Sequence, residues 1–140
     1  MVRPGSAAYP THMSLMQPTV VLVDDHEDTR VLLRYVLEES GYCVGEFPLA
    51  EEFLDHLRNA GRPSVALVDL RLPDADGMRL PHIVQNEIGA SVPLIAVSAH
   101  VVGGVKEQAL TAGFVDFISK PIDMDSLVAS VKRHLPSDHA

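Results

Sequence analysis

The chain has 140 residues and carries 19 acidic against 11 basic side chains, a formal net charge of −8. That length fits one domain, and a hydrophobic content of 46% is too high for a disordered acidic tail. The acidic balance argues against non-specific binding to nucleic acid or to an anionic membrane surface. The whole excess of negative charge falls within residues 24–76, which hold 13 acidic and 5 basic side chains.

The cellular compartment and the limits of the folded domain follow from simple features of the chain. A single cysteine, Cys43, the absence of a long apolar run and the lack of a secretory signal predict a cytoplasmic protein without membrane association. Residues 1–17 show no periodicity, which predicts a flexible tail. The residue pairs Gly5-Ser6 and His12-Met13 in this tail resemble cloning remnants. We expect the folded domain over 18–137 and a short C-terminal tail over 138–140.

Short apolar runs alternate with stretches of helical periodicity from residue 19 onward. The runs that predict strands cover 19–23, 42–46, 65–69, 94–98 and 114–118. Helices are predicted between Asp28 and Gly41 and over 50–60, 78–88, 102–112 and 124–135. The first helix is predicted from the helical spacing of Val31, Leu32, Tyr35, Val36 and Glu39. Five strands alternating with five helices predict an α/β fold, a doubly wound parallel sheet with helices on both faces.

Polar side chains follow four of the five predicted strands directly. Asp24 and Asp25 follow the first strand, Asp69 ends the third, Ser98 ends the fourth and Lys120 follows the fifth. Ligands of an open α/β sheet bind beyond the carboxyl ends of its strands, so these side chains should meet at one edge. Each alone is explained as a helix cap or a solvated side chain. Their joint occurrence favours a functional site.

The residue types at this edge suit phosphoryl chemistry. Three carboxylates repel one another and raise one another's pKa unless a cation lies between them. Mg²⁺ prefers oxygen ligands, and Lys120 adds a second positive charge. A carboxylate beside both cations is able to attack phosphorus, because the cations neutralise charge on the equatorial oxygens. The hydroxyl of Ser98 could donate a hydrogen bond to a phosphoryl oxygen.

The chain resembles the receiver domains of response regulators, the family of the chemotaxis response regulator. The resemblance covers about 19 to 135 and rests on four segments, VLVDDHEDTR at 21–30, ALVDLRLPDADG at 66–77, LIAVSAH at 94–100 and DFISKPI at 116–122. It implies a flavodoxin-like sheet with strand order 2-1-3-4-5. It also implies that Asp69 accepts a phosphoryl group with Mg²⁺ or Mn²⁺ as cofactor.

The resemblance assigns further roles residue by residue. The metal would be held by Asp24, Asp25, Asp69 and the backbone carbonyl of Arg71. Of the pair Asp24 and Asp25, it is Asp25 that would coordinate the metal directly. Three residues would bind the phosphoryl group or switch with it, namely Ser98, Ala99 and Lys120. Phe117 would be the switch aromatic, Pro121 would follow a cis peptide bond, and Arg71 and His100 would modulate the lifetime of the phosphoryl group.

The function implied is that of a signalling module and not of an enzyme. The phosphoryl group would come from a histidine kinase or a histidine phosphotransfer protein. Phosphorylation would change the face formed by the fourth helix, fifth strand and fifth helix, and drive contact with a downstream protein or homodimerisation. Because the chain ends five residues after Leu135, we expect output through a partner, unless the chain is a fragment of a longer protein.

Two other functions fit the same residues. A small phosphatase would use Asp69 as nucleophile, but such enzymes often carry a second acid two residues on, where this chain has Arg71. A binding module that keeps the fold without phosphorylation is the other. Flavin or dinucleotide binding is disfavoured, because the first strand–helix turn is acidic and not glycine-rich. The seven histidines show no metal-ligand spacing and are interpreted as surface or loop residues, and Cys43 as a packing residue.

Overall fold

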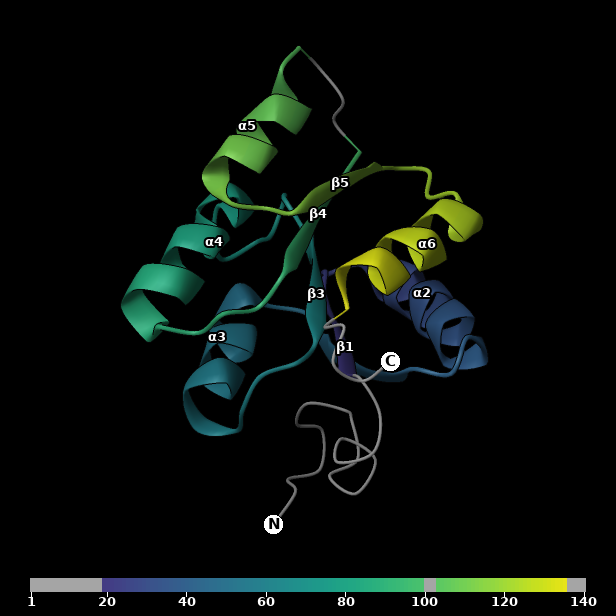
Figure 1. Ribbon diagram of the computed structural model, residues 1–140, viewed down its shortest axis with the longest axis horizontal. Coiled ribbons are helices and arrows are strands. Elements are labelled where there is room, and N and C mark those ends of the chain that lie inside the picture. Colours follow the sequence, from purple (N-terminus) through teal and green to yellow (C-terminus); the bar gives the residue numbers. More distant parts are fainter. Residues whose placement is uncertain (1–18, 100–102, 136–140) are drawn as a thin grey trace.

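The computed structural model describes residues 19–99 and 103–135 of the protein. They form a parallel sheet of five strands in the order β2-β1-β3-β4-β5, which confirms the expected topology (Figure 1). The strands are β1 (Thr19–Val23), β2 (Cys43–Phe47), β3 (Val65–Asp69), β4 (Leu94–Ser98) and β5 (Asp116–Ser119). The predicted tails, 1–17 and 138–140, lie outside the described residues. No helix in the described part of the chain is long and apolar enough to cross a membrane.

Helices cover both faces of this sheet (Figure 1). One face is covered by α2 (Glu27–Glu39) and α6 (Met124–His134). The other is covered by α3 (Ala50–Asn59), by α5 (Val105–Ala112) and by the helical segment between β3 and β4. That segment starts as a 3₁₀ turn (Gly77–Arg79), continues as α4 (Leu80–His82) and ends as a π turn (Ile83–Ile88). Pro81 lies in the first turn of α4, where its missing N–H is tolerated.

The start of α5 differs from the predicted one. The sequence predicts a helix over 102–112, a range that includes Gly103 and Gly104. Residue 102 itself lies outside the described part of the chain. The helix begins at Val105, and Gly104 precedes it as the N-cap with a φ of 84°. Glycine adopts this left-handed conformation without the steric cost that other residues meet. The glycines therefore end the preceding loop and are not part of the helix.

The core consists of two apolar layers, one on each face of the sheet. Alternate residues of β1 point into different layers, with Val21 and Val23 in one and Val20 and Leu22 in the other. The first layer is completed largely by α3, whose Phe53, Leu54 and Leu57 are buried. These two layers fix β1 and β3 at the centre of the sheet, so that the residues at their carboxyl ends are held by a packed core.

The helix α2 lies where the spacing predicts it, but most of the residues that carry the spacing are not the ones it buries. Val31, Leu32 and Tyr35 are 47%, 50% and 63% exposed, whereas Leu33 and Leu37 are buried against the sheet. The helix carries two apolar sets, each with the spacing of one helical face, so periodicity alone did not distinguish them. The approach of α2 to β1 and β2 buries the set formed by Leu33 and Leu37.

Two carboxylates join separate elements of the fold. Asp74, in the loop after β3, accepts the backbone N–H groups of Ala50 and Glu51 at 3.0 Å each, and so caps α3 from a distant loop. At the start of β5, Asp116 accepts hydrogen bonds from Ser130 Oγ at 2.6 Å and from Arg133 Nη2 at 2.7 Å, both on α6.

The electrostatic consequence of these contacts is clear at Asp116. Burial alone would raise the pKa of this carboxyl, but hydrogen bonds from Ser130, from the Phe117 backbone N–H and from Arg133 lower the pKa to about 2. Asp116 is therefore ionised in the folded protein, and its charge holds the last turns of α6 against β5.

Candidate functional site

The three carboxylates predicted from the strand ends do converge. Asp24 follows β1 and Asp69 ends β3, and these two strands are neighbours in the sheet. Both residues are buried at the carboxyl edge of the sheet, with 5% and 4% of their surface exposed. One ligand atom each from Asp24, Asp25, Asp69 and His26 can be chosen so that all lie within 4.8 Å of one another. The three carboxylates of this group are oxygen donors of the kind that Mg²⁺ and Mn²⁺ prefer, and His26 offers a ring nitrogen.

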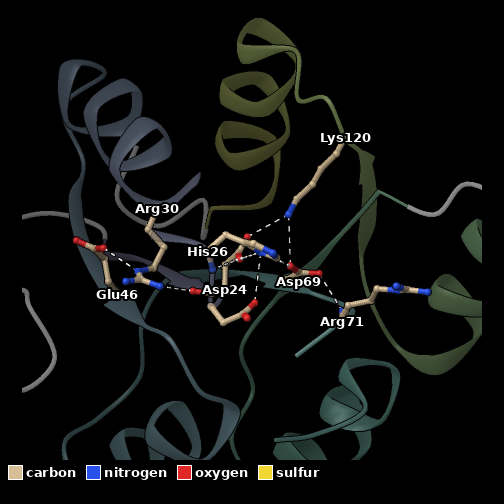
Figure 2. Close-up of polar contacts among 8 residues, drawn as sticks. Asp24, His26, Arg30, Glu46, Asp69, Arg71 and Lys120 are labelled. Carbon is tan, nitrogen blue, oxygen red and sulfur yellow. Dashed lines mark hydrogen bonds and ion pairs between the residues drawn. The ribbon is translucent and has the colours of Figure 1, made fainter. Parts of the chain in front are cut away.

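Lys120 brings a positive charge to the carboxylates, as predicted. Its Nζ lies 3.3 Å from Asp24 Oδ2 and 3.3 Å from Asp69 Oδ2 (Figure 2). The side chain reaches the carboxylates from the end of β5, two strands away from β3. The backbone N–H of Lys120 donates to the carbonyl of Ser98 at 2.8 Å, which fixes the start of this loop. The Lys120–Pro121 peptide bond is cis, which confirms the prediction for Pro121.

Asp69 is the least solvated carboxylate of the group. Its burial raises its pKa above the ordinary value, and the neighbouring negative charge of Asp24 adds to the effect. The Arg71 backbone N–H, which donates to Asp69 Oδ1 at 2.8 Å, and the Lys120 ammonium act in the opposite direction without cancelling it. A buried carboxylate with a shifted pKa and two hydrogen-bond donors in fixed positions is typical of a functional site and not of a surface cap.

His26 belongs to this site, although the sequence interpretation had left it among the surface residues. Its ring is 60% exposed, yet Nδ1 lies 3.0 Å from Asp24 Oδ1, 3.3 Å from Asp25 Oδ1 and 3.6 Å from Asp69 Oδ2. The hydrogen bond with Asp24 and the surrounding negative charges raise the pKa of the imidazole. The signal in the sequence was its position directly after the two aspartates at the end of a strand.

The remaining predicted residues lie around the carboxylates in different ways. Ser98 is buried at the end of β4, and Ala99 is exposed immediately after it. Phe117, in β5, is half-buried and packs against the core layer beneath α3 and α5. The side chain of Arg71 points away from the carboxylates, so this residue approaches Asp69 through its backbone (Figure 2). His100 lies outside the described residues.

A partly buried ion-pair network borders the site and was not predicted. Arg30, in the first turns of α2, donates from Nε to Glu46 Oε1 at 3.1 Å and from Nη1 to the backbone carbonyl of Asp24 at 2.6 Å (Figure 2). Glu46, on β2, is also paired with Arg34 of α2. The network thus joins the outer strand β2 to the loop that carries Asp24 and Asp25.

The loop after β3 passes very close to the end of that strand. A Cβ at Gly77 would lie 2.8 Å from the carbonyl oxygen of Asp69 and 2.8 Å from Leu70 Cα. The Gly77 N–H donates to the Leu70 carbonyl at 3.2 Å, and Arg71 pairs with Asp76 in an isolated β-bridge. Glycine at this position therefore lets the loop fold back onto the residues that hold the Asp69 carboxylate.

The fold and the site together define an α/β domain with buried aspartates and a lysine at the carboxyl edge of a doubly wound parallel sheet. The chain belongs to the response regulator receiver domain family, whose model matches residues 20–132. Domains of this family serve two-component systems, in which they pair with histidine kinases or phosphotransfer proteins and with downstream effectors.

Relatives of two sizes match the chain. An uncharacterized 14.6 kDa protein of Leptolyngbya boryana is 34% identical over 86% of this chain and 92% of its own length. The polar-differentiation response regulator DivK of Brucella anthropi is 31% identical over 86% of this chain and 98% of its own. The transcriptional regulator DctD of Rhizobium meliloti is 34% identical over 83% of this chain, which spans only 25% of that relative.

Solved receiver structures share the fold. A response regulator receiver protein from Pseudomonas putida superposes with a TM-score of 0.76 at 27% identity, over 84% of this chain and 97% of that one. A receiver domain described as similar to CheY, from Methanospirillum hungatei, gives a TM-score of 0.75 at 26% identity, over 84% and 92%.

Proposed function

We propose that this chain accepts a phosphoryl group on Asp69, with Mg²⁺ or Mn²⁺ as cofactor, from the phosphohistidine of a histidine kinase or phosphotransfer protein. The observation that carries the proposal is the environment of Asp69. Its buried carboxylate is held between the Arg71 N–H and Lys120 Nζ, beside the carboxylates of Asp24 and Asp25. An Asp69 oxygen attacks phosphorus, the O–P bond forms and the N–P bond to the donor imidazole breaks. The imidazole leaves with the electron pair and takes up a proton.

The residues of the site have distinct parts in this step. Asp24, Asp25, Asp69 and the Arg71 carbonyl would hold the metal, which supplies positive charge to the phosphoryl oxygens when bound. Lys120, which already contacts Asp69 Oδ2, offers a second cation to the same oxygens. Ser98, buried at the end of the adjacent strand β4, offers a hydroxyl as a hydrogen-bond donor.

The signalling output is proposed to follow from the same site. Ser98 and Phe117 would respond to the phosphoryl group and alter the face formed by α5, β5 and α6. This face already exposes two apolar side chains, Leu110 on α5 and Val115 just before β5. It would then contact a downstream protein or a second copy of the chain. We place this activity in the cytoplasm, where the single thiol of Cys43, buried in the described structure, would stay reduced.

Incubation with acetyl phosphate and Mg²⁺, followed by mass spectrometry of the intact protein, tests the proposal. We expect one phosphoryl group on the wild type, none on Asp69→Asn and none when EDTA removes the metal. Asp55→Asn, a change of the same type on the exposed face of α3, should leave the reaction unchanged and serves as the matched control. Equal labelling of the wild type and Asp69→Asn would refute the assignment.

Two further measurements separate the alternatives. Turnover of a small phosphoester beyond one equivalent would indicate a phosphatase in place of a phosphoacceptor. A chain that binds Mg²⁺ but takes no phosphoryl group from acetyl phosphate, phosphoramidate or a phosphohistidine donor would indicate a binding module. Size-exclusion chromatography with and without beryllofluoride reports whether activation drives dimerisation.

A further inference from the structure

The guanidinium of Arg30 links two structural elements that the acidic site depends on. Its side chain is only 14% exposed, and it donates both to Glu46 Oε1 on β2 and to the backbone carbonyl of Asp24 at the end of β1. Figure 2 shows it between these two acceptors, on the side of Asp24 remote from Lys120. It contacts the backbone of an acidic residue and not a carboxylate of the cluster. This makes it a candidate for orienting the loop.

The backbone around Asp25 is held at three points. The N–H of Asp24 donates to the Phe47 carbonyl at 3.1 Å, and the carbonyl of Asp24 accepts from Arg30 at 2.6 Å. One peptide further on, the N–H of His26 donates to Asp24 Oδ1 at 2.8 Å. Because peptide units are planar, these contacts fix the plane before Asp25 and the plane after it. The two dihedral angles of Asp25, and hence the direction of its Cα–Cβ bond, are set between them.

Asp25 depends on this backbone control more than its neighbours do. Its carboxylate is 36% exposed, whereas those of Asp24 and Asp69 are buried and bound by Lys120. Without a tightly packed side chain, its position in the metal site is determined mainly by its backbone. The contact that fixes the preceding peptide is the one from Arg30.

We infer that Arg30 is a positioning residue for the metal site, orienting Asp25 through the Asp24 carbonyl while Glu46 holds the guanidinium in place. This inference rests on the proposed function, because it takes Asp25 as a metal ligand. Outer residues that orient ligands typically change metal affinity 10- to 100-fold when they are mutated. The chain also offers a matched control, since Arg34 pairs with the same Glu46 from the same helix and has no contact with the Asp24 carbonyl in the described structure.

The experiment measures the Mg²⁺ dissociation constant by isothermal titration calorimetry for the wild type, Arg30→Gln and Arg34→Gln. Both variants lose one positive charge. Removing a cation near a metal site should strengthen Mg²⁺ binding, so a lost charge and lost positioning act in opposite directions. We expect Arg30→Gln to weaken Mg²⁺ binding at least about tenfold. Arg34→Gln should stay within about twofold of the wild type.

Phosphorylation kinetics and stability separate positioning from a merely structural role. For Arg30→Gln, the rate with acetyl phosphate should fall at low Mg²⁺ and return to that of the wild type when Mg²⁺ is saturating. Removing one partner of a partly buried ion pair also destabilises the fold, so urea unfolding is measured in parallel. The double variant Arg30→Gln/Glu46→Gln removes both partners of this pair and leaves Arg34, which is 39% exposed, as the remaining charge of the network. It should regain stability but not Mg²⁺ affinity.

Three results would overturn the inference. The first is an equal Mg²⁺ dissociation constant for Arg30→Gln and Arg34→Gln. The second is a stability loss in Arg30→Gln without any change in Mg²⁺ binding, and the third is recovery of affinity in the double variant. A wild type that neither binds Mg²⁺ nor takes a phosphoryl group would refute the proposed function itself, which distinguishes the two failures.

Discussion

Replacing Gly77 by alanine should disturb the acceptor aspartate although the added methyl group touches no functional side chain. The new Cβ would meet the Asp69 carbonyl oxygen at 2.8 Å, Leu70 Cα at 2.8 Å and the Leu70 carbonyl oxygen at 2.9 Å, all of them backbone atoms. Restoring contacts of at least 3.4 Å requires the two segments to separate by about 0.6 Å. Overpacking of this kind costs about 1–3 kcal/mol.

Urea unfolding is the direct assay for this variant. With an m-value of about 2 kcal/mol per M, a loss of about 2 kcal/mol lowers the midpoint by about 1 M. Since the displaced segment includes the Arg71 N–H that binds Asp69 Oδ1, the phosphorylation rate should fall as well. Gly103→Ala is the matched control, because a Cβ there meets nothing within 4 Å. Equal midpoints and rates for the two variants would refute this steric argument.

Three further changes test the contacts that hold the fold. Asp74→Ala removes the acceptor of the first two backbone N–H groups of α3 and should lower the free energy of unfolding in urea by about 1–2 kcal/mol. An unchanged free energy of unfolding would contradict this cap. The folded pKa of Asp116 is about 2 and the ordinary value is 3.8, so the contribution of its charge to stability is complete above about pH 5 and is lost as the pH falls towards 2. The stability gap between the wild type and Asp116→Asn, about 1–2 kcal/mol after allowance for solvent screening, should therefore close over that range, and a constant gap would contradict it. Leu33→Ala should cost about 2–5 kcal/mol and Leu32→Ala under about 1 kcal/mol, because only Leu33 is buried; the reverse order would contradict the placement of α2.

The strands and the carboxylates of the site were predictable because both depend on local patterns. A continuous β-branched run such as residues 19–23 is typical of a strand buried on both faces, and its carboxyl end is then known to within a residue. Since all strands of a parallel sheet end at the same edge, Asp24, Asp69 and Lys120 had to come together there. Among the strands, the predicted and observed starts differ most at the last one, which begins at Asp116 and not at Phe114. Phe114 packs in the core before the strand starts.

What sequence reasoning missed depends on how the elements are placed relative to one another. The buried face of α2 is selected by its approach to the sheet, and the periodicity of the helix allowed either face. Arg30 and Glu46 are 16 residues apart and meet only because β2 lies beside β1 at the edge of the sheet. His26 was missed for a simpler reason, since it was weighed as one of seven histidines and not as the third residue of the acidic turn.

Both outer strands of the sheet carry an ion-paired carboxylate, Glu46 in β2 and Asp116 in β5. An outer strand presents unpaired backbone groups, and a second molecule can add a strand to it. Here an incoming strand would have to cover a charge that is already committed to an arginine of the adjacent helix. The same pairs that fasten α2 and α6 should therefore keep the sheet from growing between molecules, and neutralising them should favour aggregation.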